Sequence, residues 1–147
     1  MHRGALWHAT MAASSRGRWL TTAAVLFAIL AVSNLLKPFQ IGGDQTGFVF
    51  LGKRLAGTPN AVIGPLFGVF LTVYAVGIWA MRRFALPMAR VYAAYVVVNL
   101  ILFPFRTPQP ADAGVGATVF GVVYSVVAIG VSVGTARLLA SRERDLA

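Results

Sequence analysis

A long uncharged apolar segment constrains this chain more than any other feature. The segment from Ala61 to Met81 runs for twenty-one positions without a charged side chain, and Arg82 and Arg83 follow it directly. About twenty apolar residues are enough for a helix to cross the hydrocarbon core of a bilayer. At that depth only a helix or a closed barrel satisfies every backbone hydrogen bond. We therefore expect a membrane-spanning helix over residues 59–81.

Three more segments have the length and composition of membrane-spanning helices. They cover residues 19–36, 87–104 and 114–139, and charged residues or prolines mark their ends. Of the 147 residues, 58% are hydrophobic and only 12% are charged, far from the balance of soluble domains. We therefore expect an all-α, polytopic integral membrane protein. Residues 1–147 should form a single domain with four transmembrane helices in one bundle.

The first of these segments has a second interpretation as a signal peptide. Arg16 and Arg18 precede an apolar core over residues 23–32, and the small residues Ala31 and Ser33 follow in the place of a cleavage site. This order of basic, apolar and small residues is typical of secretory signals. The basic region is long for a signal peptide, which favours a helix that remains in the membrane.

Basic residues are distributed unequally between the two sides of the predicted bundle. Thirteen Lys and Arg against four Asp and Glu give a formal net charge of +9. Nine of the thirteen fall in the leading tail, the second connection and the end of the chain, and the other side has only Lys37, Lys53, Arg54 and Arg106. The positive-inside tendency then predicts that both termini are cytoplasmic, in what we expect to be a bacterial inner membrane.

The basic residues also bear on partners. They lie at the ends of apolar segments, where they meet anionic lipid head groups. A nucleic-acid surface would instead gather them in a stripe or patch on one face. The sequence therefore predicts membrane lipids, and not nucleic acid, as partners.

The connection between the first two helices is the longest segment outside the membrane. Within it, Phe48, Leu51 and Leu55 recur at helical spacing, with Lys53 and Arg54 on the other side. This pattern predicts a short interfacial helix over residues 47–56. Glycines in and beside the segment weaken that helix. An irregular loop packed over the mouth of the bundle is the second interpretation.

The side chains that usually carry catalysis are missing from the predicted helices. The chain has no cysteine, its two histidines lie in the leading tail, and its four carboxylates lie in connections or in the final tail. Proton-coupled transport therefore lacks its usual intramembrane carboxylate, and haem ligation and general base catalysis lack a histidine. Asp44 and Asp112 share one side, but basic residues there would pair with them. We expect no enzymatic activity, no metal site and no cofactor.

A polar stripe runs along the third predicted helix. Tyr92, Tyr95, Asn99 and Arg106 stand at offsets of three, seven and fourteen, which places them within an arc of about 60°. Such a stripe should turn away from lipid, toward other helices or a cavity. Possible ligand-contacting or pore-lining residues are Tyr92, Tyr95, Asn99, Arg106, Tyr124 on the fourth helix and Asn34 on the first.

Asn99 is the central residue of this stripe. Its amide is expected to meet Tyr74 or Thr72 from the second helix, or Tyr124 from the fourth. Replacing Asn99 by leucine should then cost about 0.6 to 2 kcal/mol of bundle stability.

Glycine pairs predict close helix contacts. Gly64 and Gly68 form a GxxxG motif on the second helix, and Gly130 and Gly134 form another on the fourth. Such motifs let two helix backbones approach closely. Each pair has two interpretations, packing within one subunit or packing against another copy or a partner.

Two functions fit this set of residues. The favoured one is an accessory, assembly or structural component that binds another membrane protein or lipid, which agrees with the small size, the missing catalytic groups and the close-packing glycines. The alternative is a small carrier or oligomeric channel whose polar path is lined by the third helix.

Overall fold

The computed structural model confirms the four-helix membrane bundle. It describes residues 3–39, 47–107 and 114–147, with side chains from Arg16 onward. The four helices are α1 (Arg3–Leu35), α2 (Gly57–Trp79), α3 (Ala85–Arg106) and α4 (Val115–Ser141). Each contains a segment long and apolar enough to cross a membrane. The last three helices begin and end close to the predicted positions, whereas α1 begins well before residue 19.

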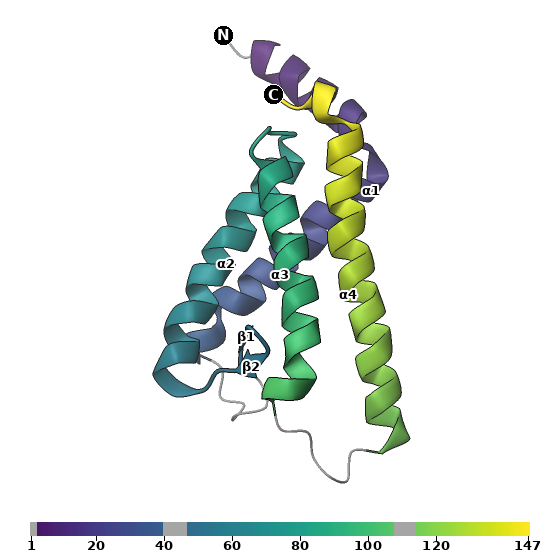
Figure 1. The fold of residues 1–147 in the computed structure, drawn as a ribbon. Helices are drawn as coiled ribbons and strands as arrows, with labels where there is room; N and C mark the ends of the chain where they lie inside the picture. Colours follow the sequence, from purple (N-terminus) through teal and green to yellow (C-terminus); the bar gives the residue numbers. More distant parts are fainter. Residues whose placement is uncertain (1–2, 40–46, 108–113) are drawn as a thin grey trace.

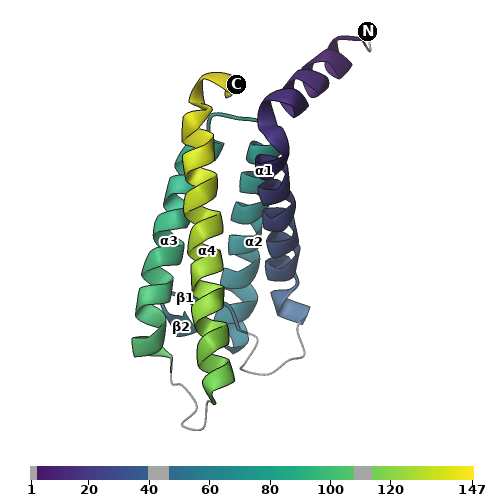
Figure 2. The same ribbon diagram turned by 90° about the vertical axis from the view of Figure 1, so that its right-hand side faces the viewer.

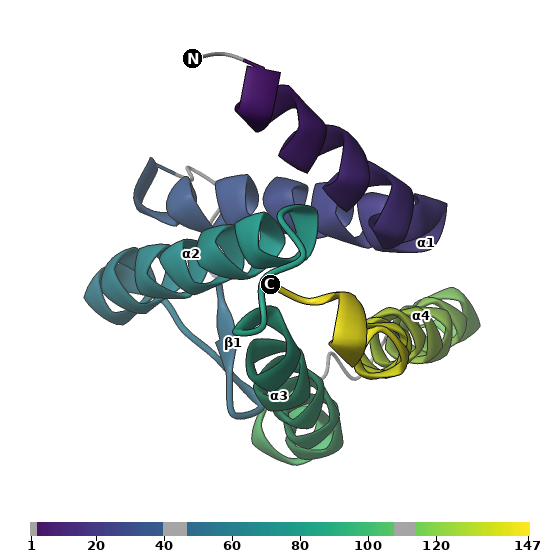
Figure 3. The same cartoon turned by 90° about the horizontal axis from the view of Figure 1, so that it is seen from above.

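The helices form two packed pairs, which the view along the bundle shows in Figure 3. α1 lies against α2, and α3 lies against α4. Both termini lie at one end of the bundle, and the α1–α2 connection lies at the other (Figures 1 and 2). We call the first the arginine end, because Arg16, Arg18, Arg82 and Arg83 lie there. The opposite end is the hairpin end, for the feature described below.

α1 bends at Gly17, where the backbone leaves the helical region with φ 67° and ψ 163°. The part before this bend leans away from the bundle (Figure 2). Arg16 anchors the bend, because its guanidinium donates to the Trp79 carbonyl and, at 2.9 Å, to the Thr21 hydroxyl. The same group lies 4.0 Å from the centre of the Trp79 ring. Arg16 thus joins the start of the α1 span to the end of α2, whose last carbonyls lack helical partners.

The apolar core is concentrated toward the arginine end. All four helices and the final residues of the chain contribute to it: Leu20, Ala23, Ala24, Phe27, Ala31, Leu71, Tyr74, Ala75, Ile78, Met81, Ala85, Leu86, Ala89, Leu139 and Leu146. The last residues are held there by backbone pairing. The Ala147 N–H donates to the Met81 carbonyl and the Arg83 N–H donates to the Ala147 carbonyl, each at 2.9 Å. The last residues of the chain therefore pack beside the α2–α3 connection and cover this end of the core.

A two-stranded hairpin replaces the predicted interfacial helix over residues 47–56. Strands β1 (Val49–Phe50) and β2 (Lys53–Arg54) pair antiparallel, and the Leu55 N–H donates to the Phe48 carbonyl at 2.8 Å. The turn between the strands has positive φ at both of its residues, 47° at Leu51 and 78° at Gly52. Two consecutive positive φ values stop a helix and suit a tight hairpin turn. The expectation of a helix here was wrong.

Candidate functional site

The polar stripe of α3 holds the hairpin by its backbone. The Tyr95 hydroxyl donates to the Val49 carbonyl at 2.7 Å, and the Asn99 amide nitrogen donates to the same carbonyl at 3.3 Å. The Asn99 amide oxygen in turn accepts from the Gly52 N–H at 2.7 Å. Asn99 thus bonds both to strand β1, at Val49, and to the turn, at Gly52. Because an unpaired backbone group is costly at membrane depth, the stripe supplies what the short hairpin lacks.

Three further side chains complete the docking. Arg106 donates to the Leu51 carbonyl at 3.1 Å, and the Thr107 hydroxyl donates to the Gly52 carbonyl at 2.7 Å. On the other side of the hairpin, the Asn60 side chain accepts from the Phe48 N–H at 2.7 Å. The hairpin is therefore bonded to the start of α2 and to the end of α3, which lie beside each other at the hairpin end.

The expected partners of Asn99 were wrong. Thr72 donates to the Gly68 carbonyl of its own helix at 2.9 Å. The Tyr74 hydroxyl is buried and has no hydrogen-bond partner among the described residues. Asn99 bonds instead to the hairpin, a segment that sequence reasoning had placed outside the bundle. The inward orientation of the stripe is as expected, because Tyr92, Tyr95 and Asn99 all line the cavity described below.

Gly52 fits the turn for two separate reasons. Its φ of 78° is a conformation that other residues rarely adopt. A Cβ atom at this position would also lie 2.5 Å from the backbone carbon of Leu102 on α3. The hairpin tip can approach α3 this closely only because the residue has no side chain.

Aromatic rings pack beneath the hairpin. The Phe67 ring lies 4.8 Å from Phe48 and 5.1 Å from Tyr95. The Tyr92 ring meets Phe27 of α1 edge-on at 5.1 Å. Offset and edge-on pairs of this kind stabilise a packed arrangement beyond the area they bury. The rings connect the docked hairpin to the core at the arginine end.

A cavity of about 500 Å³ lies among the four helices near the hairpin. Buried residues of α2 and α3, including Leu71 and Val96, form its back wall. Its lining residues on α1 and α4 are partly exposed, with Leu26 at 42% and Tyr124 at 58%. The cavity therefore opens sideways between α1 and α4, toward the membrane. Its polar lining consists of Ser33, Asn34, Lys37, Tyr92, Tyr95, Asn99, Tyr124 and Ser132.

The remaining candidate residues contribute differently to this cavity. Asn34 lines it from α1, but its amide nitrogen also donates to the Leu30 carbonyl at 2.8 Å. Tyr124 lines it from α4 and stacks on Phe120, with ring centres 6.4 Å apart. Arg106 does not line the cavity, and its contact is with the hairpin turn.

Positive charge gathers at the hairpin end of the cavity. Lys37 follows α1 directly, in the short helix η1 (Lys37–Phe39), and lines the cavity. Its pKa lies below the usual value for lysine, because burial disfavours the charged amine and the nearby Arg54 repels it. Arg54 itself lies 5.8 Å from the centre of the Phe103 ring.

The two glycine pairs have different surroundings. A Cβ atom on Gly64 would lie 2.8 Å from Lys37 side-chain atoms, and one on Gly68 would lie 2.9 Å from the backbone nitrogen of Leu35. These two glycines let α2 approach α1 within the chain. Around Gly130 and Gly134 of α4, no described atom lies within 4 Å of such a Cβ.

Sequence reasoning did not single out three residues of this site. Asn60 lies at the start of the second predicted helix, Thr107 follows the end of the third, and Lys37 is one of the four basic residues on the less basic side. An amide or hydroxyl directly beside an apolar helix end was the available signal, because such groups often bond to nearby backbone. Their actual partner, the hairpin, was not predicted.

Comparisons with models of known protein families, with curated proteins and with solved structures find no match to this chain. The described residues include no group of three or more histidine, cysteine or carboxylate side chains that could hold a metal ion.

Proposed function

We propose that this chain is an accessory membrane protein that binds a lipid-like amphiphile in the cavity among its four helices. The observation that carries the proposal is the cavity itself, which is concave, mostly apolar, and has Asn34 and Lys37 in its lining at the hairpin end. This combination is typical of small-molecule sites. The sideways opening between α1 and α4 gives a ligand access from within the bilayer.

The chemistry of the lining defines the ligand class. Leucine, valine and phenylalanine side chains suit an apolar body, and Asn34 and Lys37 suit a polar group. Lys37 is a basic residue in the lining at this end, and an anionic group is complementary to it. The ligand we propose therefore has an apolar chain and an anionic head at the hairpin end.

Two features favour binding over conduction. The Tyr95 and Asn99 side chains are bonded to the hairpin, so they stabilise the fold instead of offering a polar path. Toward the arginine end, the cavity gives way to fully buried apolar side chains such as Leu20 and Ile78. A carrier or channel would need a route through that core, so we place this alternative second.

Binding is tested with cis-parinaric acid, a fluorescent anionic fatty acid, and with its uncharged methyl ester. Energy transfer from the tryptophans to the probe reports binding to the protein in lipid nanodiscs. Ala128→Phe fills the cavity from α4 and should weaken binding of both probes at least tenfold. Ala117→Phe makes the same change at an exposed position of the same helix and should leave binding unchanged.

The head-group assignment has its own pair of variants. Lys37→Gln should weaken binding of the acid and spare the ester, whereas Lys53→Gln, on the exposed part of the hairpin, should affect neither. Equal binding by the parent and Ala128→Phe would refute the cavity as the site. Equal binding of acid and ester by the parent would refute the anionic head.

We further propose that the protein resides in a bacterial inner membrane with both termini cytoplasmic. The excess of arginine at the arginine end supports this orientation. Trp19 and Trp79 lie at the same end, as an interfacial belt would place them. A terminal reporter fusion that is active only outside the cytoplasm would contradict it. The purified protein is expected to have no hydrolytic or redox activity of its own.

A further inference from the structure

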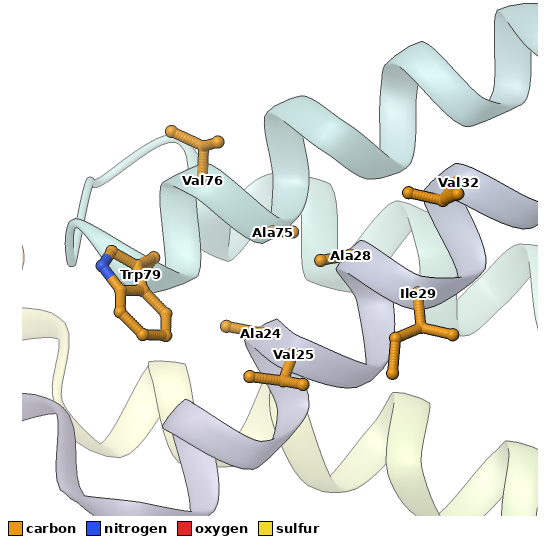
Figure 4. A pocket seen from close by; sticks show the side chains of 8 residues that line it. All are labelled: Ala24, Val25, Ala28, Ile29, Val32, Ala75, Val76 and Trp79. Carbon is orange, nitrogen blue, oxygen red and sulfur yellow. The ribbon is translucent and has the colours of Figure 1, made fainter. Parts of the chain in front are cut away.

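A second apolar depression lies on the membrane-facing side of α1 and α2 and shares only Ile29 with the lining of the cavity among the four helices. It is a groove of about 490 Å³ in which every lining side chain is apolar. Figure 4 shows Ala28 and Ala75 pointing toward one another between the two helices, and Ala24 pointing to the side on which Trp79 lies. Larger side chains rise on both sides, among them Ile29 at 60% exposure and Trp79 at 51%. The small residues form the floor and the large ones form the walls.

The shape of the groove suits one linear apolar chain. On α1 it extends from Ala24 to Val32, which corresponds to about 12 Å along the helix axis at 1.5 Å per residue. Because no polar side chain lines it, it offers nothing to a head group within this length. A hydrocarbon chain running roughly parallel to the helices meets these requirements.

A basic residue, Arg18, lies beyond the end of the groove, where the head group of a lipid would lie if its acyl chain occupied the groove. Arg18 precedes Val25 by seven residues and Val32 by fourteen, so the three share one face of α1. The α1 helix is regular across this interval, since its non-helical residue, Gly17, lies before Arg18. Arg18 is exposed. Arginine at the head-group level attracts anionic lipids.

Trp79 marks the same end of the groove. Its ring is one wall, and Arg16 holds the residue in place by stacking on the ring and bonding to its carbonyl. Tryptophan is enriched at the depth of the glycerol and head-group region. Neither α2 nor the part of α1 from Arg16 onward contains an acidic residue that would oppose an anion.

We propose that this groove binds one acyl chain of an anionic phospholipid, with its phosphate at Arg18 and its glycerol region beside Trp79. The site lies in the bilayer leaflet at the arginine end, whereas the head group of the proposed cavity ligand lies at the hairpin end. A single arginine near the membrane surface corresponds to a roughly fivefold preference for an anionic over a zwitterionic lipid.

Quenching of Trp79 by brominated acyl chains tests the proposal. Trp7→Phe and Trp19→Phe leave Trp79 as the only tryptophan of the full chain. The protein is placed in phosphatidylcholine vesicles that contain a brominated-chain phosphatidylglycerol or a brominated-chain phosphatidylcholine at the same mole fraction. The anionic lipid should associate about fivefold more strongly, as measured from the dependence of quenching on mole fraction.

Matched variants separate the head group from the chain. Arg18→Gln should remove the preference between the two lipids, whereas Arg90→Gln, at an exposed position of α3, should retain it. Ala28→Leu fills the groove and should reduce quenching by both lipids, whereas Ala94→Leu on the exposed side of α3 should not. Circular dichroism of each variant checks the fold.

Three outcomes would overturn the proposal. The first is equal association of the two brominated lipids with the parent. The second is an equal loss of preference in Arg18→Gln and Arg90→Gln. The third is undiminished quenching in Ala28→Leu.

Discussion

At the arginine end of the bundle, apolar side chains from all four helices pack with almost no exposed area, whereas at the hairpin end a short segment is fastened by hydrogen bonds. Leu20 and Ile78 represent the first arrangement, 1% and 0% exposed. Asn99 and Tyr95 represent the second, each bonded to hairpin backbone. In a membrane, lipid is as apolar as a leucine side chain, so the packed half depends on close contact and not on transfer from water. The hairpin half depends on leaving no backbone group unpaired.

We therefore expect the packed half to contribute mainly to stability and the hairpin half mainly to ligand binding. The packed half can fix the helices relative to one another without any polar group, and its core has no room for a ligand. The hairpin half leaves the cavity beside it open toward α1 and α4. Changes in the two halves should therefore differ in kind, and the following predictions compare them from the largest effect to the smallest.

Removing a ring from the packed half should have the largest effect on stability. Phe27→Ala leaves a void beneath Tyr74 and Tyr92, whose rings lie 4.7 and 5.1 Å away. Such large-to-small changes cost about 3 kcal/mol or more. The free energy of unfolding in mixed detergent micelles measures the loss. Phe105→Ala is the control, because Phe105 is 82% exposed and should change little. Similar losses for both variants would contradict the assignment of Phe27 to the core.

A side chain at Gly52 should undock the hairpin. Gly52→Ala places a Cβ atom on a residue with positive φ and against the backbone of Leu102. We expect the free energy of unfolding to fall by about 2 kcal/mol. Gly57→Ala is the matched control, because Gly57 also has positive φ, 58°, but has open space around it. The chain has no cysteine, so thiol labelling of Val49→Cys reports exposure of the hairpin cleanly. Faster labelling with Gly52→Ala than with Gly57→Ala is expected, and equal rates would rule out the close approach to α3.

Asn99→Leu should cost more than Asn34→Leu. Asn99 bonds to two backbone groups of another segment, and its loss leaves the Gly52 N–H without this acceptor. We expect about 1 to 2 kcal/mol, the upper part of the range for such bonds in membranes. Asn34 bonds to its own helix at the Leu30 carbonyl, so its loss should cost about 0.6 kcal/mol or less. Unfolding free energies of the two variants, measured in parallel, make the comparison. An equal or larger cost for Asn34→Leu would argue against the docking role of Asn99.

Two tyrosine hydroxyls provide the finest comparison between the halves. Tyr95→Phe removes the 2.7 Å bond to the Val49 carbonyl and should cost about 1 kcal/mol. Tyr74→Phe removes a buried hydroxyl that has no partner among the described residues, so stability should stay unchanged or rise slightly. Thermal unfolding of the two variants is sufficient to rank them. A larger loss for Tyr74→Phe would show that the packed half also relies on polar bonds.

Much of the architecture follows from the sequence alone. The long apolar segments predict the four helices, because little else is stable over that length in a bilayer. The offsets of Tyr92, Tyr95 and Asn99 fix which side of α3 faces inward, because helical periodicity is independent of the partner that is met there.

The hairpin could not be predicted in the same way. The spacing of Phe48, Leu51 and Leu55 matches a helical face, but the turn needs positive φ at two residues, one of them a leucine. Asn-Gly or Asp-Gly is the usual signature of such a turn, and Leu51–Gly52 carries only half of it. Bonds from Arg106 and Thr107 hold the turn from a distance of fifty-five residues. Local sequence propensity cannot predict hydrogen bonds between residues so far apart in the chain. The cavity could not be predicted for the same reason, because its walls come from segments distant in the sequence.

The order of the chain gives the docked hairpin a consequence for biosynthesis. The ribosome adds Gly52 forty-seven residues before Asn99, whose side chain accepts the hydrogen bond from the Gly52 N–H. At ribosomal speeds of about 5 to 20 residues per second, the nascent hairpin waits about 2 to 10 s for its partner. During that time its backbone is satisfied by water or by the insertion machinery, and not by the bilayer. The hairpin therefore enters its final place only after α3 has been inserted, which makes it a late step of assembly.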